Sequence, residues 1–287
     1  MKFAAGIHSV TEFGNDTIRF SEALAIISDC GFERVMLVSV PQGPTLSRGQ
    51  TPNGAFLNLA TSDLDLVAGQ LRRAGLEIEV VHAAGVNASK PEAMDESIEW
   101  LRAICEAGVQ LDCRYVGHSC GGAAASGMST ADKQDDIKRL AEIVDTVASE
   151  APDMYFAVDV HCRGIVETVA DCEYYLEQLA SSNAGILLNT GHLTTCKQPG
   201  WELAQNYPDR TPIIGWKDHL PPSEEGRAFD SVELGTGDTP FEKYIEVIKL
   251  QTTDRAHCIA FEHVPNDQRK EALRASREYL EDLWDRI

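Results

Sequence analysis

Short apolar stretches alternate along the chain with longer segments whose apolar residues recur at helical spacing. Gly185 to Leu188 is apolar without alternation, which is typical of a strand buried on both faces of a parallel sheet. The apolar stretches predict eight strands, at residues 2–8, 34–40, 77–82, 111–118, 154–160, 185–189, 212–216 and 257–262. Helices are predicted after them, at residues 17–30, 62–74, 91–107, 130–149, 166–179, 201–206, 241–250 and 267–287.

A regular alternation of strands and helices implies a parallel sheet with right-handed crossovers. Eight repeats in 287 residues predict an α/β protein with one closed (β/α)8 domain, a TIM barrel, over residues 1–287. A doubly wound open sheet is the alternative fold. No Gly-x-Gly-x-x-Gly follows the first strand, so the sequence lacks a dinucleotide-binding motif.

Local signals refine these boundaries. Ser62 is a plausible N-cap of the second helix, and Gly75 and Gly108 are expected to end the second and third helices. The segment from Pro41 to Asn58 is rich in Pro, Gly, Ser and Thr and predicts a long loop. Such a loop is either a functional cover or a disordered surface excursion.

Most of the histidines lie where predicted strands end. Seven of the eight are at or just past a carboxyl end, and His257 alone lies at a strand's beginning. In a parallel barrel the carboxyl ends form one face, where active sites lie. The seven residues, which predict a functional cluster at this rim, are His8, His82, His118, His161, His192, His219 and His263.

Other polar residues follow the same strands. Asp159, Asn189, Lys217, Asp218 and Glu262 end strands five to eight. A barrel mouth lined by His, Asp, Asn and Glu side chains suits one divalent cation such as Mn²⁺, Mg²⁺, Co²⁺ or Zn²⁺. The cation can chelate sugar oxygens and stabilise an enediolate, while two carboxylates exchange the proton of the reacting carbon.

The order of these motifs resembles the xylose isomerase-like TIM-barrel superfamily of sugar isomerases and epimerases. The motifs are D-V-H (159–161), N-T-G-H (189–192), K-D (217–218), L-G-T-G-D (234–238) and F-E-H (261–263). The resemblance covers the whole chain and implies a metal site whose four ligand positions fall on Asp159, Asn189, Gly215 and Glu262. Glu262 alone matches the family pattern outright, and an acid often found in strand two is replaced by Met36.

We assign roles on this basis. Expected catalytic residues are Glu262, Asp159, Lys217, His161 and His219. Expected substrate contacts are His8, His82, His118, Trp216, Asp218 and Arg163. Expected metal ligands are Asp159, Asn189, Glu262 and His192, which could move into a vacant ligand position.

Three functions remain open at this point. The first, which we favour because the polar rim is so rich, is a metal-dependent sugar isomerase, epimerase or dehydratase. The second is a metal-independent enzyme on the same barrel, such as a lyase acting on a keto-sugar. The third is a non-catalytic sugar-binding barrel or a subunit of a larger complex.

The net charge and the cysteine content bear on the binding partners and on the location of the protein. The net charge is −20, from 45 acidic and 25 basic residues, which argues against nucleic acid and anionic membranes as partners. The eight cysteines include no Cys-x-x-Cys pair, so reduced thiols and a cytoplasmic location are expected, without a secretory signal or membrane span. The expected partner is a small sugar or keto-sugar, and a homo-oligomer is possible.

Overall fold

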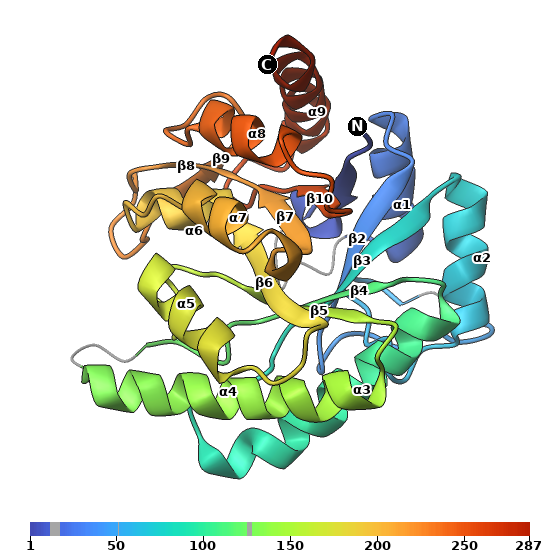
Figure 1. Ribbon diagram of the computed structural model, residues 1–287. Helices are drawn as coiled ribbons and strands as arrows, with labels where there is room; N and C mark the ends of the chain where they lie inside the picture. Colours follow the sequence, from blue (N-terminus) through green and yellow to red (C-terminus); the bar gives the residue numbers. More distant parts are fainter. Residues whose placement is uncertain (12–17, 51, 125–127) are drawn as a thin grey trace.

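The computed structural model describes residues 1–11, 18–50, 52–124 and 128–287, and in these ranges eight parallel strands form a closed barrel (Figure 1). The strands are β1 (Ala4–Gly6), β2 (Arg34–Ser39), β3 (Glu77–Ala83), β4 (Tyr115–His118), β5 (Tyr155–Asp159), β6 (Ala184–Asn189), β7 (Ile213–Trp216) and β10 (Ala256–Ile259). The predicted TIM barrel is confirmed. Several strands are shorter than expected, and the chain from Ile7 to Ser9 forms a 3-10 turn in place of the end of the first strand.

The barrel closes between its first and last strands. β10 pairs with β7 on one side and with β1 on the other, and the register places Ala4 opposite Cys258. Closure satisfies the backbone groups that an open sheet would leave unpaired at its edges.

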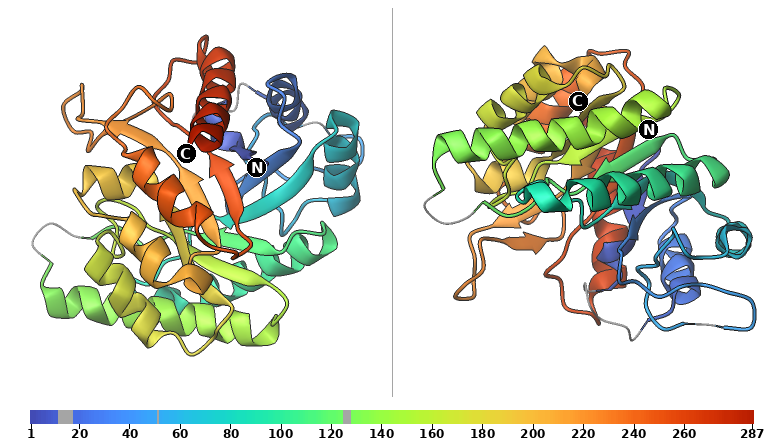
Figure 2. Two further views of the ribbon diagram at one scale, coloured as in Figure 1. Left: turned by 45° about the horizontal axis from the view of Figure 1, so that its top comes forward. Right: turned by 90° about the horizontal axis from the view of Figure 1, so that it is seen from below.

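Helices cover the outside of the barrel. They are α1 (Phe20–Asp29), α2 (Leu64–Ala74), α3 (Met94–Gln110), α4 (Thr130–Glu150), α5 (Val169–Gln178), α6 (Thr190–Thr195), α7 (Trp201–Asn206), α8 (Phe241–Lys249) and α9 (Arg269–Arg286). The last helix packs beside the first (Figure 2), and Lys270 Nζ lies 2.8 Å from Asp29 Oδ2. No described helix is both long and apolar enough to cross a membrane.

Two predicted helix ends are corrected. Asp63, and not Ser62, caps α2, because its side chain accepts a hydrogen bond from the Leu66 amide while Ser62 Oγ binds the loop at Leu46. Gly75 ends α2 in the left-handed conformation, as expected, with φ of 69°. Gly108 lies inside α3, because the left-handed turn that leaves this helix occurs at Asp112, with φ of 58°.

A short hairpin lies at the mouth of the barrel, directly after β7. Its strands are β8 (Asp218–Leu220) and β9 (Asp230–Val232), which pair in antiparallel fashion. The sequence analysis did not predict α6, whose first turn coincides with the N-T-G-H motif.

The long loop after β2 packs against the barrel. Phe56 and Leu57 are buried, and Leu57 O accepts hydrogen bonds from Ser39 Oγ at 3.0 Å and from the Val40 amide at 3.3 Å. In the described parts of the loop, residues 41–50 and 52–58, the chain therefore forms an ordered layer rather than a disordered excursion, and none of these residues lines the site cavities.

Two separate apolar layers result from the alternation along the strands. The larger lies between barrel and helices, and the smaller fills the barrel interior with Ala4, Met36, Val80, Tyr115, Ala157, Leu187, Ile213, Ala256 and Cys258. Several interior side chains are alanines, which leaves space above them at the carboxyl ends of the strands.

The start of β6 gives a test of this close packing. A Cβ on Gly185 would lie 2.2 Å from the carbonyl oxygen of Arg210, a backbone atom that cannot move without shifting β7. We expect Gly185→Ala to lower the free energy of unfolding by about 1–3 kcal/mol, measured by urea denaturation.

Gly69→Ala is the matched control. A Cβ at Gly69 in α2 meets only flexible arginine side chains at 3.6 Å or more, so this change should stabilise the protein by roughly 0.5–1 kcal/mol. Equal effects of the two substitutions would contradict the packing described here.

Candidate functional site

A cavity of about 270 Å³ opens at the carboxyl ends of the strands, inside the barrel. Met36, Leu187 and Cys258 belong to the interior apolar layer and form its floor. The polar side chains on its wall are His8, His82, Asp159, His161, Asn189, Lys217 and Glu262, together with Ser119 and Cys120. The volume lies just below the usual range for ligand sites, about 300–1,000 Å³, so the cavity suits a small molecule.

An ion pair between Lys217 and Glu262 crosses this cavity. Lys217 Nζ lies 2.5 Å from Glu262 Oε1, and the lysine side chain is 6% exposed. Burial by itself lowers the pKa of Lys217, but the charges of Glu262 and Asp159 outweigh it and raise that pKa above its usual value. Burial likewise favours the neutral form of Glu262, and the charge of Lys217 overcomes it and lowers the Glu262 pKa. Both groups are therefore charged at neutral pH.

Neighbouring elements fix the backbone of both residues. Thr190 Oγ1 accepts a hydrogen bond from the Lys217 amide at 2.9 Å, and Thr239 Oγ1 donates to the Lys217 carbonyl at 3.2 Å. Arg269 donates to the Glu262 carbonyl at 2.6 Å and to the His8 carbonyl at 3.2 Å. Sequence reasoning missed these positioning residues, because nothing in their spacing connects them with the strand ends.

Asp159 is the second carboxylate of the cavity. Its Oδ1 accepts a hydrogen bond from Asn189 Nδ2 at 2.9 Å, and its Oδ2 lies 3.6 Å from His82 Nε2. Burial raises the pKa of this carboxyl, but the contact with His82 and the charge of Lys217 outweigh burial and lower the pKa to about 2. Asp159 is thus ionised at neutral pH.

Three of the predicted histidines reach the cavity wall: His8, His82 and His161. Burial and the nearby charge of Lys217 lower the pKa of His8 to about 3, so this imidazole is neutral. Gly117 on β4 leaves the space that the His82 ring fills, since a Cβ there would lie 2.9 Å from His82 Cδ2.

The structure does not bring His118 and His219, for which we predicted roles in substrate binding and proton transfer, to the walls of these cavities. His118 follows the outward-facing Val116 by two residues, so its side chain leaves the barrel interior. His219 turns into the hairpin, where its ring stacks on Phe229 at a centroid distance of 4.0 Å and Nδ1 contacts Thr195 Oγ1.

Trp216 and Asp218, which we expected to contact substrate, have structural roles. Trp216 is fully buried between barrel and helices, where its Nε1 donates to His257 Nδ1 at 3.2 Å. Asp218 is also fully buried, and its carboxylate accepts hydrogen bonds from the amides of Gly235, Gly237 and Thr239. The Gly-Thr-Gly-Asp segment is therefore held by the carboxylate of the first residue of the hairpin.

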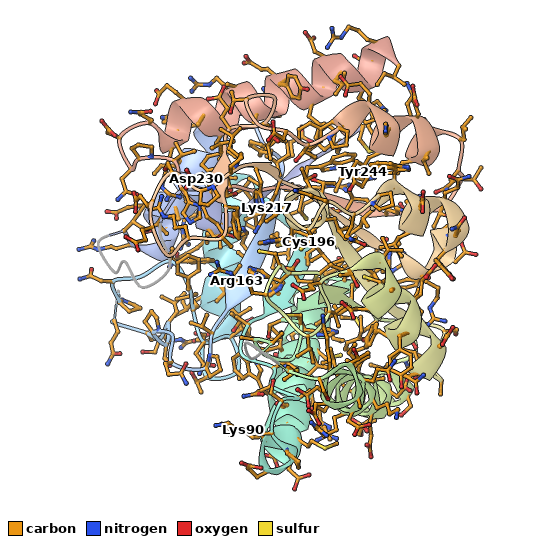
Figure 3. The ribbon with its side chains drawn as sticks, turned by 90° about the vertical axis from the view of Figure 1, so that its left-hand side faces the viewer. Lys90, Arg163, Cys196, Lys217, Asp230 and Tyr244 are labelled. Atoms are coloured by element: carbon orange, nitrogen blue, oxygen red, sulfur yellow. The ribbon has the colours of Figure 1, made fainter. Side chains whose placement is uncertain are left out.

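A second, outer cavity of about 590 Å³ adjoins the first and shares Ser119, Cys120 and His161 with it. Arg163 and His263 line this outer cavity. The Arg163 guanidinium donates to the carbonyls of Gly226 and Arg227, which connects the loop after β5 with the hairpin. Figure 3 shows Lys217, Arg163 and Cys196 near the middle of the view.

The residues at the metal positions of the family do not fit a divalent cation. Asn189 points its amide nitrogen at Asp159 and uses its oxygen to cap α6 at the His192 amide. Gly215 has no side chain, and a Cβ there would lie 2.9 Å from Leu187. The ammonium group of Lys217 already provides the positive charge beside Glu262.

The structure does not bring the predicted ligand set together. Asp159, His192 and Glu262 do not form a group whose ligand atoms all lie within 4.8 Å of one another in the described ranges. His192 lies in α6, where its ring packs on His161 at a centroid distance of 3.7 Å, and Glu262 pairs with Lys217.

The closed parallel barrel with its charged groups at the carboxyl ends defines a TIM-barrel protein with a site in the usual place for this fold. The chain belongs to the family of xylose isomerase-like TIM barrels, whose model matches residues 24–283. The expected resemblance is thereby confirmed. No curated protein matches the sequence.

Solved structures share the fold at low sequence identity. One is the IolI protein with a bound zinc atom, at 14% identity and a TM-score of 0.72, covering 100% of this chain and 99% of the other. Another is the probable 3-DHS dehydratase AsbF from Bacillus anthracis, at 16% identity and a TM-score of 0.72. The match covers 98% of this chain and 99% of the other. A third is D-allulose 3-epimerase from Methylomonas sp. in complex with D-allulose, at 13% identity and a TM-score of 0.73. The match covers 98% of this chain and 96% of the other.

The buried neutral histidines predict a falling stability in mild acid. Burial lowers the pKa of His118 to about 4 and of His257 to about 3, whereas the unfolded chain protonates near 6.5. Below that pH the unfolded state binds protons that the folded state does not, so each such histidine costs up to about 1.4 kcal/mol per pH unit. Urea midpoints should therefore fall between pH 7 and pH 5.

His257→Gln is the control, because glutamine can still accept the Trp216 hydrogen bond and does not titrate. The pH dependence of this variant should be shallower than that of the wild type. A urea midpoint that is constant or rises from pH 7 to pH 5 would show that the histidines are not buried in the neutral form.

Proposed function

We propose that this protein is an enzyme that moves a proton at a carbon next to the carbonyl group of a small keto-sugar. In this proposal the Lys217 ammonium, and not a divalent cation, stabilises the enolate. The observation that carries the proposal is the buried contact of 2.5 Å between Lys217 Nζ and Glu262 Oε1 inside the cavity. The comparisons support the substrate class, since they include an epimerase structure in complex with D-allulose.

The charge of Lys217 supports its proposed role as the group that stabilises the enolate. A lysine whose pKa is raised remains an ammonium, so it acts as an electrostatic stabiliser rather than as an amine nucleophile. The ammonium has three hydrogen-bond donors, so it can bind Glu262 and a substrate oxygen at the same time. Because the pocket is buried, its charges interact more strongly than they would in water.

Two ionised carboxylates are available as bases. Asp159 or Glu262 takes the proton from the carbon, the electron pair of the C–H bond forms the enolate double bond, and the carbonyl π pair moves to the oxygen, which Lys217 stabilises. Return of the proton to the opposite face of the same carbon gives an epimer. Return to the former carbonyl carbon, with transfer of the neighbouring hydroxyl proton to the enolate oxygen, gives an isomer. Re-formation of the carbonyl group with expulsion of a β-hydroxyl group, which takes up the abstracted proton and leaves as water, gives a dehydration. His8 and His82 on the same wall can bind the remaining hydroxyl groups.

Solvent deuterium exchange tests this function without assuming the outcome of the reaction. A panel of ketopentoses and ketohexoses is incubated with the protein in D₂O, and loss of the proton next to the carbonyl is followed by NMR. We expect exchange whose rate does not rise with added Mn²⁺ or Mg²⁺. Lys217→Met should slow it by about 10²–10³-fold, because the preorganised charge on the enolate is lost.

Glu262→Gln keeps the shape of the side chain and should also slow exchange, whereas Asp238→Asn, at an exposed position between β9 and α8, should not. Exchange that requires an added divalent cation and survives Lys217→Met would favour the metal-dependent enediolate instead. Saturable sugar binding without exchange would indicate a non-catalytic sugar-binding barrel.

A further inference from the structure

Three nitrogen and sulfur side chains lie together behind the wall of the inner cavity. His161 and Cys162 follow β5, and His192 comes from α6. One ligand atom from each lies within 4.8 Å of the other two, and no other group of three or more His, Cys, Asp or Glu is so close in the described ranges. Bond lengths to zinc of about 2.0–2.3 Å place the ligand atoms of one ion some 3–4 Å apart. The group therefore needs a contraction of about 1 Å.

His192 provides a second, independent observation. Its side chain is fully buried, and neither ring nitrogen has a hydrogen-bond partner in the part of the chain that is described. Aromatic rings surround it, with His161 at 3.7 Å and both Phe229 and His219 at 4.8 Å between centroids. A buried imidazole without partners is unfavourable unless something binds it. A metal ion accepts the lone pair of a neutral imidazole and removes that penalty.

His161 is oriented as metal-bound histidines usually are. Its Nδ1 lies 2.8 Å from the carbonyl oxygen of Cys162, so it can donate there and leave Nε2 as the ligand atom. A histidine that ligates a metal typically gives its other N–H to a carbonyl or carboxylate in this way, which fixes both tautomer and ring orientation.

Sulfur ligands complete the group. The Cys162 thiol is buried, and Cys196, one residue past the end of α6, hydrogen-bonds to it. Binding of a cation to Cys162 would displace the thiol proton.

We infer that His161, Cys162 and His192, with Cys196 available as the fourth ligand, form a binding site for one zinc-type transition-metal cation. Imidazole and thiolate ligands in a tetrahedral set select Zn²⁺ over Mg²⁺ or Ca²⁺, which prefer oxygen ligands. This site differs from the carboxylate positions of the family, and it lies outside the Lys217–Glu262 pair. It is independent of the proposed enzymatic function.

The ion would have a positioning role. His161 lines both the inner and the outer cavity, so a metal bond at its Nε2 would fix its ring at the wall between them. The same ion would connect the end of β5 with α6, whose first residues contact the backbone of Lys217.

Cobalt spectroscopy and zinc competition test the inference on the intact protein. The metal-free protein is titrated with Co²⁺, and a bond to thiolate produces intense near-ultraviolet absorption that nitrogen and oxygen ligands do not produce. We expect this band at one Co²⁺ per chain, and its loss when Zn²⁺ is added. Absence of the band in the wild-type protein would overturn the inference, and this measurement requires no variant.

Variants then locate the site. Loss of an outer-shell partner already weakens metal binding by about 10–100-fold, so Cys162→Ser and His192→Gln should each weaken Zn²⁺ binding by about 100-fold or more. Cys105→Ser, the same change at a buried cysteine on α3, should leave zinc binding unchanged, as should Glu262→Gln. Zinc binding that survives Cys162→Ser, or that is lost with Glu262→Gln, would place the ion elsewhere and overturn the inference.

Discussion

The buried ion pair between Lys217 and Glu262 is the constraint on which the site depends. A single charge enclosed in the barrel would be strongly unfavourable, so each of these side chains is tolerated only because the other is present. Asp159 adds a second negative charge that the same ammonium offsets. The cavity therefore carries two carboxylates and one ammonium group, and the surrounding hydrogen bonds hold the backbones in place.

The contacts around this pair show how the barrel builds a site from distant segments. Thr190 begins α6, Thr239 precedes α8, and Arg269 begins α9, yet all three bind the backbone of residues at the strand ends. Arg269 also joins the ends of β1 and β10, the two strands whose pairing closes the barrel. The same interactions that complete the fold thus fix the orientation of the charged groups.

The sequence was sufficient to predict the barrel, because strand and helix periodicities differ and repeat eight times. It also placed Asp159, Lys217 and Glu262 at the mouth correctly, since strand ends share one face. It was not sufficient to predict where each side chain points. His118 lies at the same rim as the cavity but faces outward, by strand alternation, and Asp218 follows Lys217 yet turns to the amides of the Gly-Thr-Gly-Asp segment. The hairpin and α6 depend on tertiary contacts that no local pattern encodes.

The pairing of β1 with β10 has a consequence for how the molecule forms. Ala4 and Cys258 are opposite each other in the sheet but about 250 residues apart along the chain. Each βα unit can assemble from neighbouring residues, whereas ring closure requires a search over nearly the entire polypeptide, and contacts of such high contact order slow folding. The cavity wall is complete only after this closure, because His8 follows β1 whereas Glu262 follows β10. Lys217 and Glu262 follow the neighbouring strands β7 and β10, so a partly folded barrel can contain their ion pair without the complete cavity.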